Sequence, residues 1–406
     1  MLIRNYRRNS LWYQCLKILV LLLATWSAIE LIYIRNALIR EASKEPPRLG
    51  REKVFITSIH WNNELILRSH WNDAVVELVQ EIGRENVFVS VQESGSFDDS
   101  KGALRDLDAR LEELGVARAI LLDDTTHLDD IHKQPEATGW IHTPRGELEL
   151  RRIPYLAKLR NLVMQPMYEL ERQQGYKFDK VLFLNDVIFS NRDVRNLFAT
   201  RGGEYAAACS LDFSKPYRFY DTFALRDAEG HDELMLTWPY FRSRKSRQAL
   251  KASLPVPVQS CWNGIVAMDA APFYKSENRL EFRGTPDSLA TQHLEGSECC
   301  LIHADNPLSR TKGVWLNPNV RVGYNEEAYR AVNRRYSSPW VGSFQIIFGS
   351  WKNRFLRWTT SVWWKERLVL QKVKEWEEKA VGNAEPGPFC LINEMQVLTW
   401  NGWAHL

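Results

Sequence analysis

The residue best placed for metal or phosphate chemistry is a carboxylate that directly follows a short apolar run. Asp186, preceded by Asn185, lies in the segment 180–191, KVLFLNDVIFSN, in which residues 181–184 have the composition of a buried strand. Ligands of open α/β sheets bind just outside the carboxyl ends of the strands. A carboxylate there suits a hard divalent cation such as Mg²⁺ or Mn²⁺, which can hold a nucleotide diphosphate. The alternative is a strand followed by an Asx-type turn.

Alternating strand and helix patterns position this segment. The apolar spacing predicts strands over 54–58, 87–91, 119–122 and 181–184, and helices over 64–82, 104–114 and 153–174. Such repeated βα units predict an α/β fold with a mostly parallel sheet covered by helices. Beyond residue 191 the pattern loosens, and strands over 205–209 and 264–268 flank a polar, aromatic section. Two unlike halves suit an enzyme that holds a donor in one and an acceptor in the other.

Composition indicates an ordinary folded protein. The chain has 406 residues, 45% hydrophobic and 25% charged, which is enough for one large domain or two smaller ones. Its net charge is only +3, so bulk electrostatics give no reason to expect a nucleic-acid partner.

One apolar stretch, residues 15–34, approaches the roughly 20 residues that a bilayer-spanning helix needs. Arg4, Arg7, Arg8 and Lys17 precede or open it and favour a cytoplasmic N-terminus. No small-residue cleavage site follows, so a retained signal anchor is predicted, with a cytoplasmic tail over 1–14 and a stem over 35–52. The alternative is a buried N-terminal helix. With an anchor, the remaining chain lies in a secretory lumen.

Five of the six cysteines follow the predicted anchor, namely Cys209, Cys261, Cys299, Cys300 and Cys390. A secretory lumen permits disulfides, and an odd number leaves at least one of these thiols unpaired within a monomer. Neither a C-x-x-C pair nor a zinc-like spacing is present.

Residues 340–379 are rich in tryptophan and basic residues. Trp351, Phe355, Trp358 and Val362 are spaced to line one face of a helix. Two interpretations remain open: an amphipathic helix that rests on the membrane beside the anchor, or a helix packed on the catalytic domain.

Eight segments, in this order, resemble a known family. They are VFITSIHWNNELIL (54–67), VFVSVQESGSFDDSKGAL (87–104), LAKLRN (156–161), VLFLNDVIF (181–189), ACSLDF (208–213), YDTFALRDAEG (220–230), CWNGIVAMDAAPF (261–273) and SECCLIHAD (297–305). Together they are similar to the fungal α-1,3-mannosyltransferase family, which includes the cryptococcal capsule mannosyltransferase and its capsule-associated relatives. The resemblance runs from about residue 53 to about residue 331.

This resemblance implies a Golgi type II membrane glycosyltransferase with a GT-A-like fold. It implies transfer of mannose from GDP-mannose to a mannose-containing glycan, with α-1,3 linkage and a divalent metal. The catalytic domain is expected over 53–335, with the donor half at about 53–200 and the acceptor half at about 201–335. A tryptophan-rich helical extension is expected over 336–406.

The resemblance places the metal at Asp186, where LND stands instead of the commoner D-x-D. Because one carboxylate is a poor site by itself, His303 is the expected second ligand, and its imidazole favours Mn²⁺ over Mg²⁺. Glu298 matches the acidic position that faces the acceptor, either as general base in an inverting reaction or, in a retaining one, as a group that stabilises the sugar cation or acts as nucleophile. Asp212 is the second catalytic candidate, through the hydroxyls of the donor sugar.

The remaining expected site residues bind the two substrates. On the donor side Glu93 and Ser94 would contact the ribose, Arg160 a phosphate, and Asn161 and Asn185 the same nucleotide. On the sugar and acceptor side we expect Trp262, Asn263 and Asp221.

Three alternatives stay open. The same fold could use another nucleotide-sugar donor. A membrane-anchored scaffold of polysaccharide synthesis could have lost catalysis altogether, because LND supplies only one carboxylate. The metal site could instead be formed by Asp123 and Asp124, which also end an apolar strand.

Overall fold

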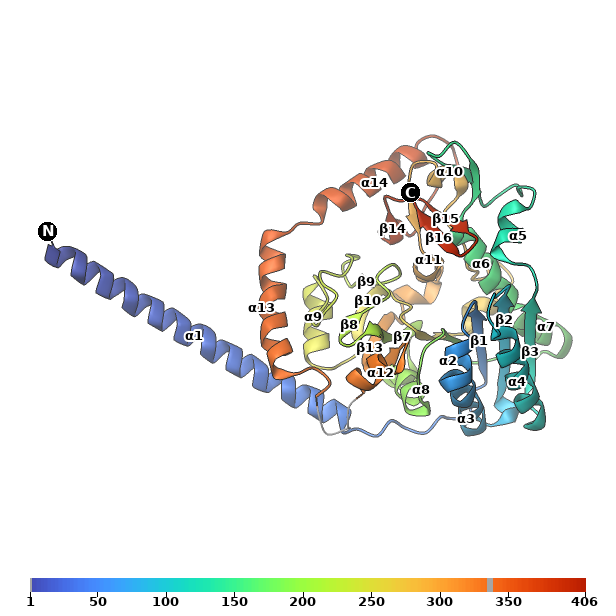
Figure 1. The fold of residues 1–406 in the computed structure, drawn as a ribbon, viewed down its shortest axis with the longest axis horizontal. Helices are drawn as coiled ribbons and strands as arrows, with labels where there is room; N and C mark the ends of the chain where they lie inside the picture. Colours follow the sequence, from blue (N-terminus) through green and yellow to red (C-terminus); the bar gives the residue numbers. More distant parts are fainter. Residues whose placement is uncertain (1, 334–338) are drawn as a thin grey trace.

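The computed structural model describes residues 2–333 and 339–406. The chain forms an α/β domain built on one large sheet. A single long helix at the N-terminus, α1, projects away from this domain (Figure 1).

The large sheet has ten strands in the order β3-β2-β1-β6-β11-β7-β13-β10-β9, with β8 paired to β7. Its strands are β1 (Val54–His60), β2 (Val87–Ser94), β3 (Ala117–Asp123), β6 (Lys180–Leu184), β7 (Ala207–Lys215), β8 (Arg218–Phe219), β9 (Arg226–Asp227), β10 (Val256–Ser260), β11 (Ile265–Asp269) and β13 (Val314–Gly323). Strands β3, β2, β1 and β6 are parallel, whereas β11 is antiparallel to both β6 and β7. This arrangement confirms the predicted α/β class, with a sheet that is parallel from β3 to β6.

Helices flank the sheet. They are α2 (Glu64–Ile66), η1 (Leu67–Trp71), α3 (Asn72–Ile82), α4 (Ser100–Glu113), α5 (His127–His132), α6 (Arg152–Val163), α7 (Gln165–Gln174), α8 (Asn191–Phe198), α9 (Arg244–Lys251), α10 (Asp287–Ala290), α11 (Glu298–Asp305) and α12 (Glu326–Val332). The single helix predicted over 153–174 is two helices that meet at Met164. Pro166 is tolerated in the first turn of α7 but could not have continued α6, because proline lacks the amide hydrogen that an inner turn requires.

Two apolar cores lie on the two sides of the sheet. Strands β2 and β6 are buried along their whole lengths, which explains the apolar runs over 87–89 and 181–184. A tight turn follows β2 at Gly95, whose φ is +60° and where a Cβ atom would lie 2.0 Å from the carbonyl oxygen of Thr125. Only glycine fits this turn without strain.

Helix α1 (Leu2–Ala42) extends beyond the predicted span of 15–34. Within the described residues it is the one helix long and apolar enough to cross a membrane, from Trp12 to Ala42. Ile34 and Leu38 near its C-terminal end are nevertheless buried in the core of the domain. The first part of the predicted stem, 35–42, is therefore helical and docked on the domain.

The C-terminal region wraps along the domain as α13 (Ser343–Thr359) and α14 (Trp363–Glu377) (Figure 1). It then forms the short strands β14 (Leu391–Ile392), β15 (Gln396–Thr399) and β16 (Gly402–His405). The predicted extension over 336–406 is thus helical only in its first part. Its predicted boundary with the catalytic domain, at 335/336, lies outside the described residues.

Two disulfides join Cys209 to Cys261 and Cys300 to Cys390. Cys299 is left as a buried free thiol, which confirms that one of the five cysteines beyond the predicted anchor is unpaired.

Candidate active site

A cavity of about 810 Å³ opens at the carboxyl ends of β1, β2 and β6. This is the edge of the sheet at which open α/β folds bind ligands. Seven of the residues predicted from the sequence line it, namely Ser94, Arg160, Asn185, Asp186, Asp221, Trp262 and Glu298. Five others do not, namely Glu93, Asn161, Asp212, Asn263 and His303.

Asp186 leaves β6 and places its carboxylate on the cavity wall. Its Oδ2 accepts a hydrogen bond of 2.9 Å from the side-chain amide of Asn63. Burial raises the pKa of Asp186 to about 6, and the neutral amide of Asn63 offsets only part of that rise. A carboxylate with a neutral partner is suited to receive a cation.

The protein alone offers few ligands for such a cation. Among residues 2–333 and 339–406, no three His, Cys, Asp or Glu side chains are grouped so that they could hold a metal ion. Asp186 therefore fits a divalent cation only where a diphosphate and water supply most of the ligands, as is common for Mg²⁺.

A chain of polar contacts leads from Asn185 to Glu298. The indole Nε1 of Trp262 donates to Asn185 Oδ1 at 3.0 Å, and the guanidinium of Arg160 lies 4.5 Å from the centre of the Trp262 ring. Arg160 Nε in turn donates to Glu298 Oε1 at 2.9 Å. The predicted phosphate ligand Arg160 is thus paired with the predicted acceptor-side carboxylate.

Asp212 lies behind the cavity wall, with no exposed surface. It accepts hydrogen bonds from the backbone amide of Asp221 (3.3 Å), the Asn263 amide (3.3 Å) and the Tyr324 hydroxyl (3.2 Å). Burial, and then the charge of Asp221, raise the pKa of Asp212 to about 7. Asp212 and Asn263 therefore hold the Asp221 loop in place and do not contact the cavity.

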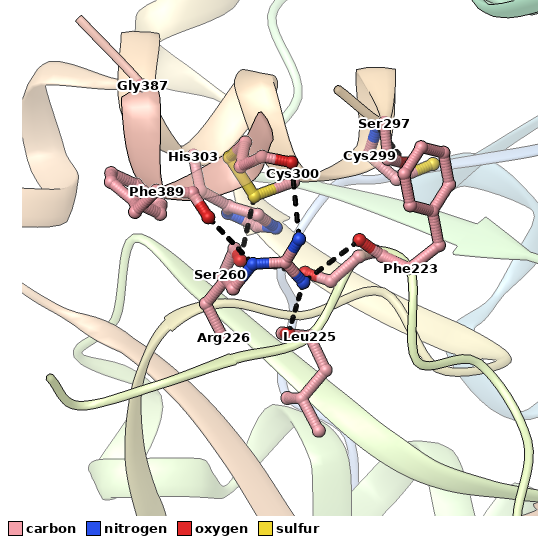
Figure 2. The surroundings of a disulfide bond; sticks show 12 residues. Phe223, Leu225, Arg226, Ser260, Ser297, Cys299, Cys300, His303, Gly387 and Phe389 are labelled. Carbon is pink, nitrogen blue, oxygen red and sulfur yellow. Dashed lines mark hydrogen bonds between the residues drawn. A yellow bond between two sulfur atoms is a disulfide. The ribbon is translucent and has the colours of Figure 1, made fainter. Parts of the chain in front are cut away.

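His303 does not join Asp186. It is buried, and its Nε2 donates to the carbonyl oxygen of Cys261 at 2.6 Å. Burial lowers its pKa to about 4, so the ring is neutral at physiological pH. In Figure 2 it lies beside the Cys300–Cys390 disulfide, on the same helix as Glu298. The predicted metal pair of Asp186 and His303 is not supported by this placement.

Two predicted donor ligands also point away from the cavity. The Glu93 carboxylate is buried, accepts from the backbone amide of Ser96 and forms an ion pair with Lys101, so it stabilises the turn after β2. Asn161 exchanges two hydrogen bonds with the backbone of Phe282 and lines a separate cavity of about 730 Å³. Ser94 does line the main cavity, where its hydroxyl lies 2.8 Å from that of Tyr155.

The alternative metal pair is placed elsewhere. Asp123 accepts from the backbone amide of Thr125 and borders the second cavity, whereas the Asp124 side chain is almost fully exposed. Neither lines the cavity that contains Asp186 and Glu298.

A further wall of the cavity comes from a part of the chain that the sequence analysis left outside the site. The C-terminal strands contribute Ile392, Glu394, Gln396, Leu398, Trp403 and His405. The guanidinium of Arg152, which also lines the cavity, stacks 3.9 Å from the centre of the Trp403 ring. Strands of two to four residues carry little pattern, so only the high tryptophan content could have drawn attention to them.

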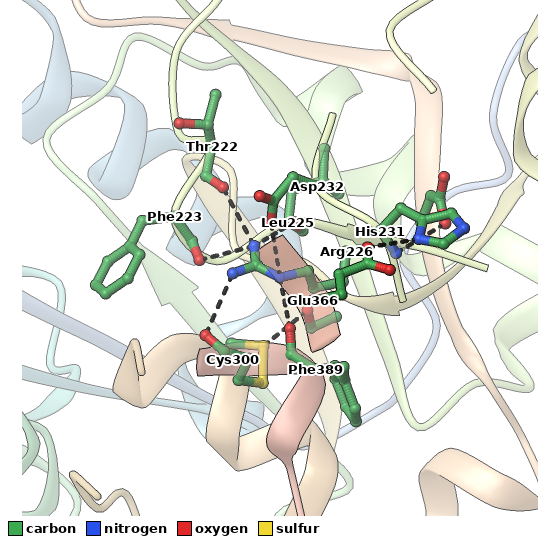
Figure 3. A network of polar contacts seen from close by, with 12 residues as sticks. Thr222, Phe223, Leu225, Arg226, His231, Asp232, Cys300, Glu366 and Phe389 are labelled. Carbon is green, nitrogen blue, oxygen red and sulfur yellow. Dashed lines mark hydrogen bonds and ion pairs between the residues drawn. A yellow bond between two sulfur atoms is a disulfide. The ribbon is translucent and has the colours of Figure 1, made fainter. Parts of the chain in front are cut away.

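A covalent link and a buried arginine fasten this wall to the domain. The Cys300–Cys390 disulfide ties the segment before β14 to α11, which begins at Glu298 (Figure 2). Arg226, which is buried, donates to the carbonyl oxygens of Phe389 (2.7 Å) and Cys390 (3.2 Å) and forms an ion pair with Asp232 (3.2 Å; Figure 3). The cavity wall is therefore a fixed part of the fold.

Comparison with known proteins indicates the same family as the eight segments do. The family model described as cryptococcal mannosyltransferase 1 matches residues 53–305. The chain is similar to the alpha-1,3-mannosyltransferase CMT1 of Cryptococcus neoformans var. neoformans serotype D, with 23% identity over 283 residues. The match covers 64% of this chain and 55% of the relative, so the chain spans about half the length of that curated protein.

Solved structures are more distantly similar. The mannosyltransferase PcManGT from Pyrobaculum calidifontis, solved with GDP-Man and Mn²⁺, is 14% identical with a TM-score of 0.40, over 91% of this chain and 77% of that one. Glucosyl-3-phosphoglycerate synthase from Mycobacterium tuberculosis is 14% identical with a TM-score of 0.30, over 67% of this chain and 70% of that one. Likeness at this level carries no conclusion about substrate or metal.

Proposed function

The chain belongs to the cryptococcal mannosyltransferase 1 family of glycosyltransferases, and from this premise we propose that it moves mannose from GDP-mannose to a mannose-containing glycan with α-1,3 linkage. One observation carries the proposal for this chain: the carboxylates of Asp186 and Glu298 line a single cavity at the carboxyl edge of the sheet. Such a pair suits a glycosyl transfer, with one carboxylate near the leaving diphosphate and one near the acceptor.

The diphosphate end of the reaction is assigned to Asp186. A divalent cation, when bound, would screen the negative charge that develops on the leaving diphosphate. Asp186 would hold that cation, with Asn63 fixing the carboxylate through its 2.9 Å hydrogen bond. With His303 directed elsewhere, the reason to favour Mn²⁺ over Mg²⁺ disappears, so we propose a divalent cation of either kind.

The sugar end is assigned to Glu298 and its neighbours. Arg160 orients the Glu298 carboxylate, which would either accept the proton of the acceptor hydroxyl or face the sugar cation. The Trp262 ring is almost completely buried between Arg160 and Phe282, so its role is to hold Asn185 through its indole Nε1, not to stack on a pyranose as expected. The Asp221 carboxylate, held by the backbone amides of Phe223 and Ala224, is proposed to bind sugar hydroxyls.

We further propose a Golgi membrane location with the catalytic domain in the lumen. Helix α1 is long and apolar enough to act as the signal anchor, and the basic residues near its N-terminal end favour a cytoplasmic N-terminus. Two disulfides in the domain fit an oxidising compartment.

The test is donor binding and turnover by the full chain in detergent, because Ile34 and Leu38 of α1 belong to the domain core. GDP- and UDP-sugars are compared with and without Mg²⁺ or Mn²⁺, using wild type, Asp186→Asn and the exposed control Asp124→Asn. Metal-dependent turnover of GDP-mannose that only Asp186→Asn abolishes is the expected result. Turnover of another nucleotide sugar would change the donor, and binding of none by a folded chain would favour a scaffold role.

A further inference from the structure

Helix α13 separates two kinds of side chain on opposite faces. Its buried residues, Ile346, Gly349, Ser350 and Asn353, pack on the domain, where the Asn353 amide donates to the carbonyl oxygen of Phe241 at 3.2 Å. The large apolar residues on the other face are exposed to solvent, namely Phe344, Ile347, Phe348, Phe355 and Trp358. At 100° per residue these five lie within about 100° of one another, which makes a single continuous stripe. We call these five residues the α13 stripe.

The α13 stripe lies on the side of the domain from which α1 emerges. Trp351 falls in the middle of the stripe, and its Nε1 donates to Ser27 Oγ of α1 at 2.9 Å. Its ring also contacts that of Trp26, with centroids 6.3 Å apart. Figure 1 shows one end of α13 beside α1, near the point where α1 leaves the domain.

Ion pairs fix the level of α13 along α1. Glu30 is bound by Arg354 of α13 at 2.7 Å and by Lys251 of α9 at 2.6 Å. A helix from Trp12 to Glu30 is roughly 28 Å long, close to the roughly 30 Å hydrocarbon thickness of a bilayer. An ion-paired carboxylate belongs at the boundary of that layer. Helix α13 is therefore held at the membrane boundary, where tryptophan side chains are enriched.

Positive charge gathers at the C-terminal end of the stripe. Arg242 donates to the carbonyl oxygen of Thr360, which directly follows α13. Burial, and then the charges of Arg357 and Arg354, lower the pKa of Arg247 to about 10, so these guanidinium groups lie close together. Such a cluster is complementary to lipid phosphates.

We propose that α13 is an interfacial helix, whose α13 stripe inserts into the lipid leaflet beside α1 and holds the catalytic domain against the membrane. The partner is the phospholipid bilayer. The inference goes beyond glycosyl transfer and rests on the proposed membrane anchor alone. Both interpretations of residues 340–379 then apply to α13, because one face of this helix contacts the domain and the other faces lipid.

The experiment places a photo-crosslinking benzoylphenylalanine at single positions of the full chain, reconstituted in phosphatidylcholine–phosphatidylserine nanodiscs. Phe348 and Phe355 report on the α13 stripe, and Leu21 on α1. Phe97, in the loop between β2 and α4, is the matched control, because its exposed fraction is 54% against 56% for Phe348. Thermal unfolding of each variant verifies the fold, and two stripe positions guard against one that fails to fold.

Several-fold more lipid adduct at Phe348 and Phe355 than at Phe97 is the expected result. If lipid adduct forms at Leu21 but both stripe positions give only the level of Phe97, the proposal of an interfacial helix is wrong and the proposal of a membrane anchor is kept. Crosslinks from the stripe to a second copy of the chain, in place of lipid, would also overturn it. Absence of lipid adduct at Leu21 would overturn the anchor and the interfacial helix together, while donor turnover would be unaffected.

Discussion

Arg160 Nε lies 2.9 Å from Glu298 Oε1 and joins α6 to the first residue of α11, although 138 positions separate the two residues. Both side chains are almost completely shielded from solvent. Removing one member of a buried ion pair leaves an uncompensated charge, whereas replacing both members often costs little. Arg160 is therefore a positioning residue that fixes the Glu298 carboxylate, which we propose faces the acceptor.

The first prediction concerns this ion pair. Arg160→Met should lower the free energy of unfolding by about 3 kcal/mol, because Glu298 is left buried without its partner. Adding Glu298→Gln should restore most of that loss. Denaturant unfolding measures both, and Lys158→Met is the control, since Lys158 lies on the same helix but is exposed. A double variant that is less stable than Arg160→Met would contradict the interpretation.

The second prediction concerns pH and Asp212. Its pKa is about 7 in the folded chain and near the ordinary value of about 3.9 in the unfolded chain. The folded state therefore binds this proton more tightly, so its contribution to stability is present below pH 4 and is lost as pH rises to about 7. Asp212→Asn removes the titration while keeping an acceptor for Tyr324.

Thermal unfolding at several pH values measures this effect. Between pH 4.5 and 7.5 the melting temperature of Asp212→Asn should rise relative to that of wild type. Asp124→Asn, which removes an exposed carboxylate, is the control. The difference between its melting temperature and that of wild type should stay constant with pH. A constant difference for Asp212→Asn as well would show that Asp212 titrates normally.

Strands β1, β2 and β6 of the parallel half could be predicted from the sequence because they are buried on both faces of the sheet. Strand β6 shows why: each residue from Lys180 to Leu184 is buried, and the carboxylate that follows reaches the cavity. His303 could not be placed in the same way. Five residues turn a helix by about 140° beyond a full turn, so Glu298 faces the cavity and His303 faces the Cys261 carbonyl.

The C-terminal wall of the cavity could not be predicted for a different reason. Five cysteines allow several pairings, and the sequence does not say that Cys390 joins Cys300. Arg226 binds this segment through backbone carbonyl oxygens, which every residue carries. Contacts of that kind fix a tertiary arrangement without leaving a signal in residue types.

The third prediction concerns the Cys300–Cys390 disulfide. Replacing both residues by alanine should cost about 2 to 4 kcal/mol of stability, because the crosslink closes a long loop. The double variant is needed, since a single one would leave a free thiol near Cys299. Loss of the tether should also loosen the wall formed by β15 and β16.

Hydrogen exchange and kinetics measure that loosening. Amides of residues 396–405 should exchange faster in the double variant, and KM for the acceptor should rise more than kcat falls. The Cys209→Ala/Cys261→Ala variant is the control, because that disulfide joins β7 to the residue before Trp262 and does not reach the C-terminal strands. Unchanged exchange over 396–405 would mean that non-covalent contacts, among them those of Arg226 and the Arg152–Trp403 stacking, hold the segment without the disulfide.

The fourth prediction concerns the ionisation of Asp186. Its pKa is about 6, and a metal-binding role requires the carboxylate form, so kcat/KM should fall as pH drops below about 6. Protons and divalent cations compete for the same oxygens, so more Mg²⁺ or Mn²⁺ should shift this acid limb to lower pH. Asn63→Ala removes the hydrogen bond that favours the charged form, so it should shift the limb to higher pH.

Steady-state profiles at two metal concentrations test this argument. Asn86→Ala, at a position whose side-chain amide donates to Ile82 and Glu85 outside the cavity, controls for loss of an amide elsewhere and should leave the profile unchanged. An acid limb whose position changes neither with metal concentration nor with Asn63→Ala would show that Asp186 is not a metal ligand. That outcome alone would not support a scaffold role, because an enzyme that holds its cation elsewhere would also give it. Absence of donor binding and turnover in the wild type would be needed as well.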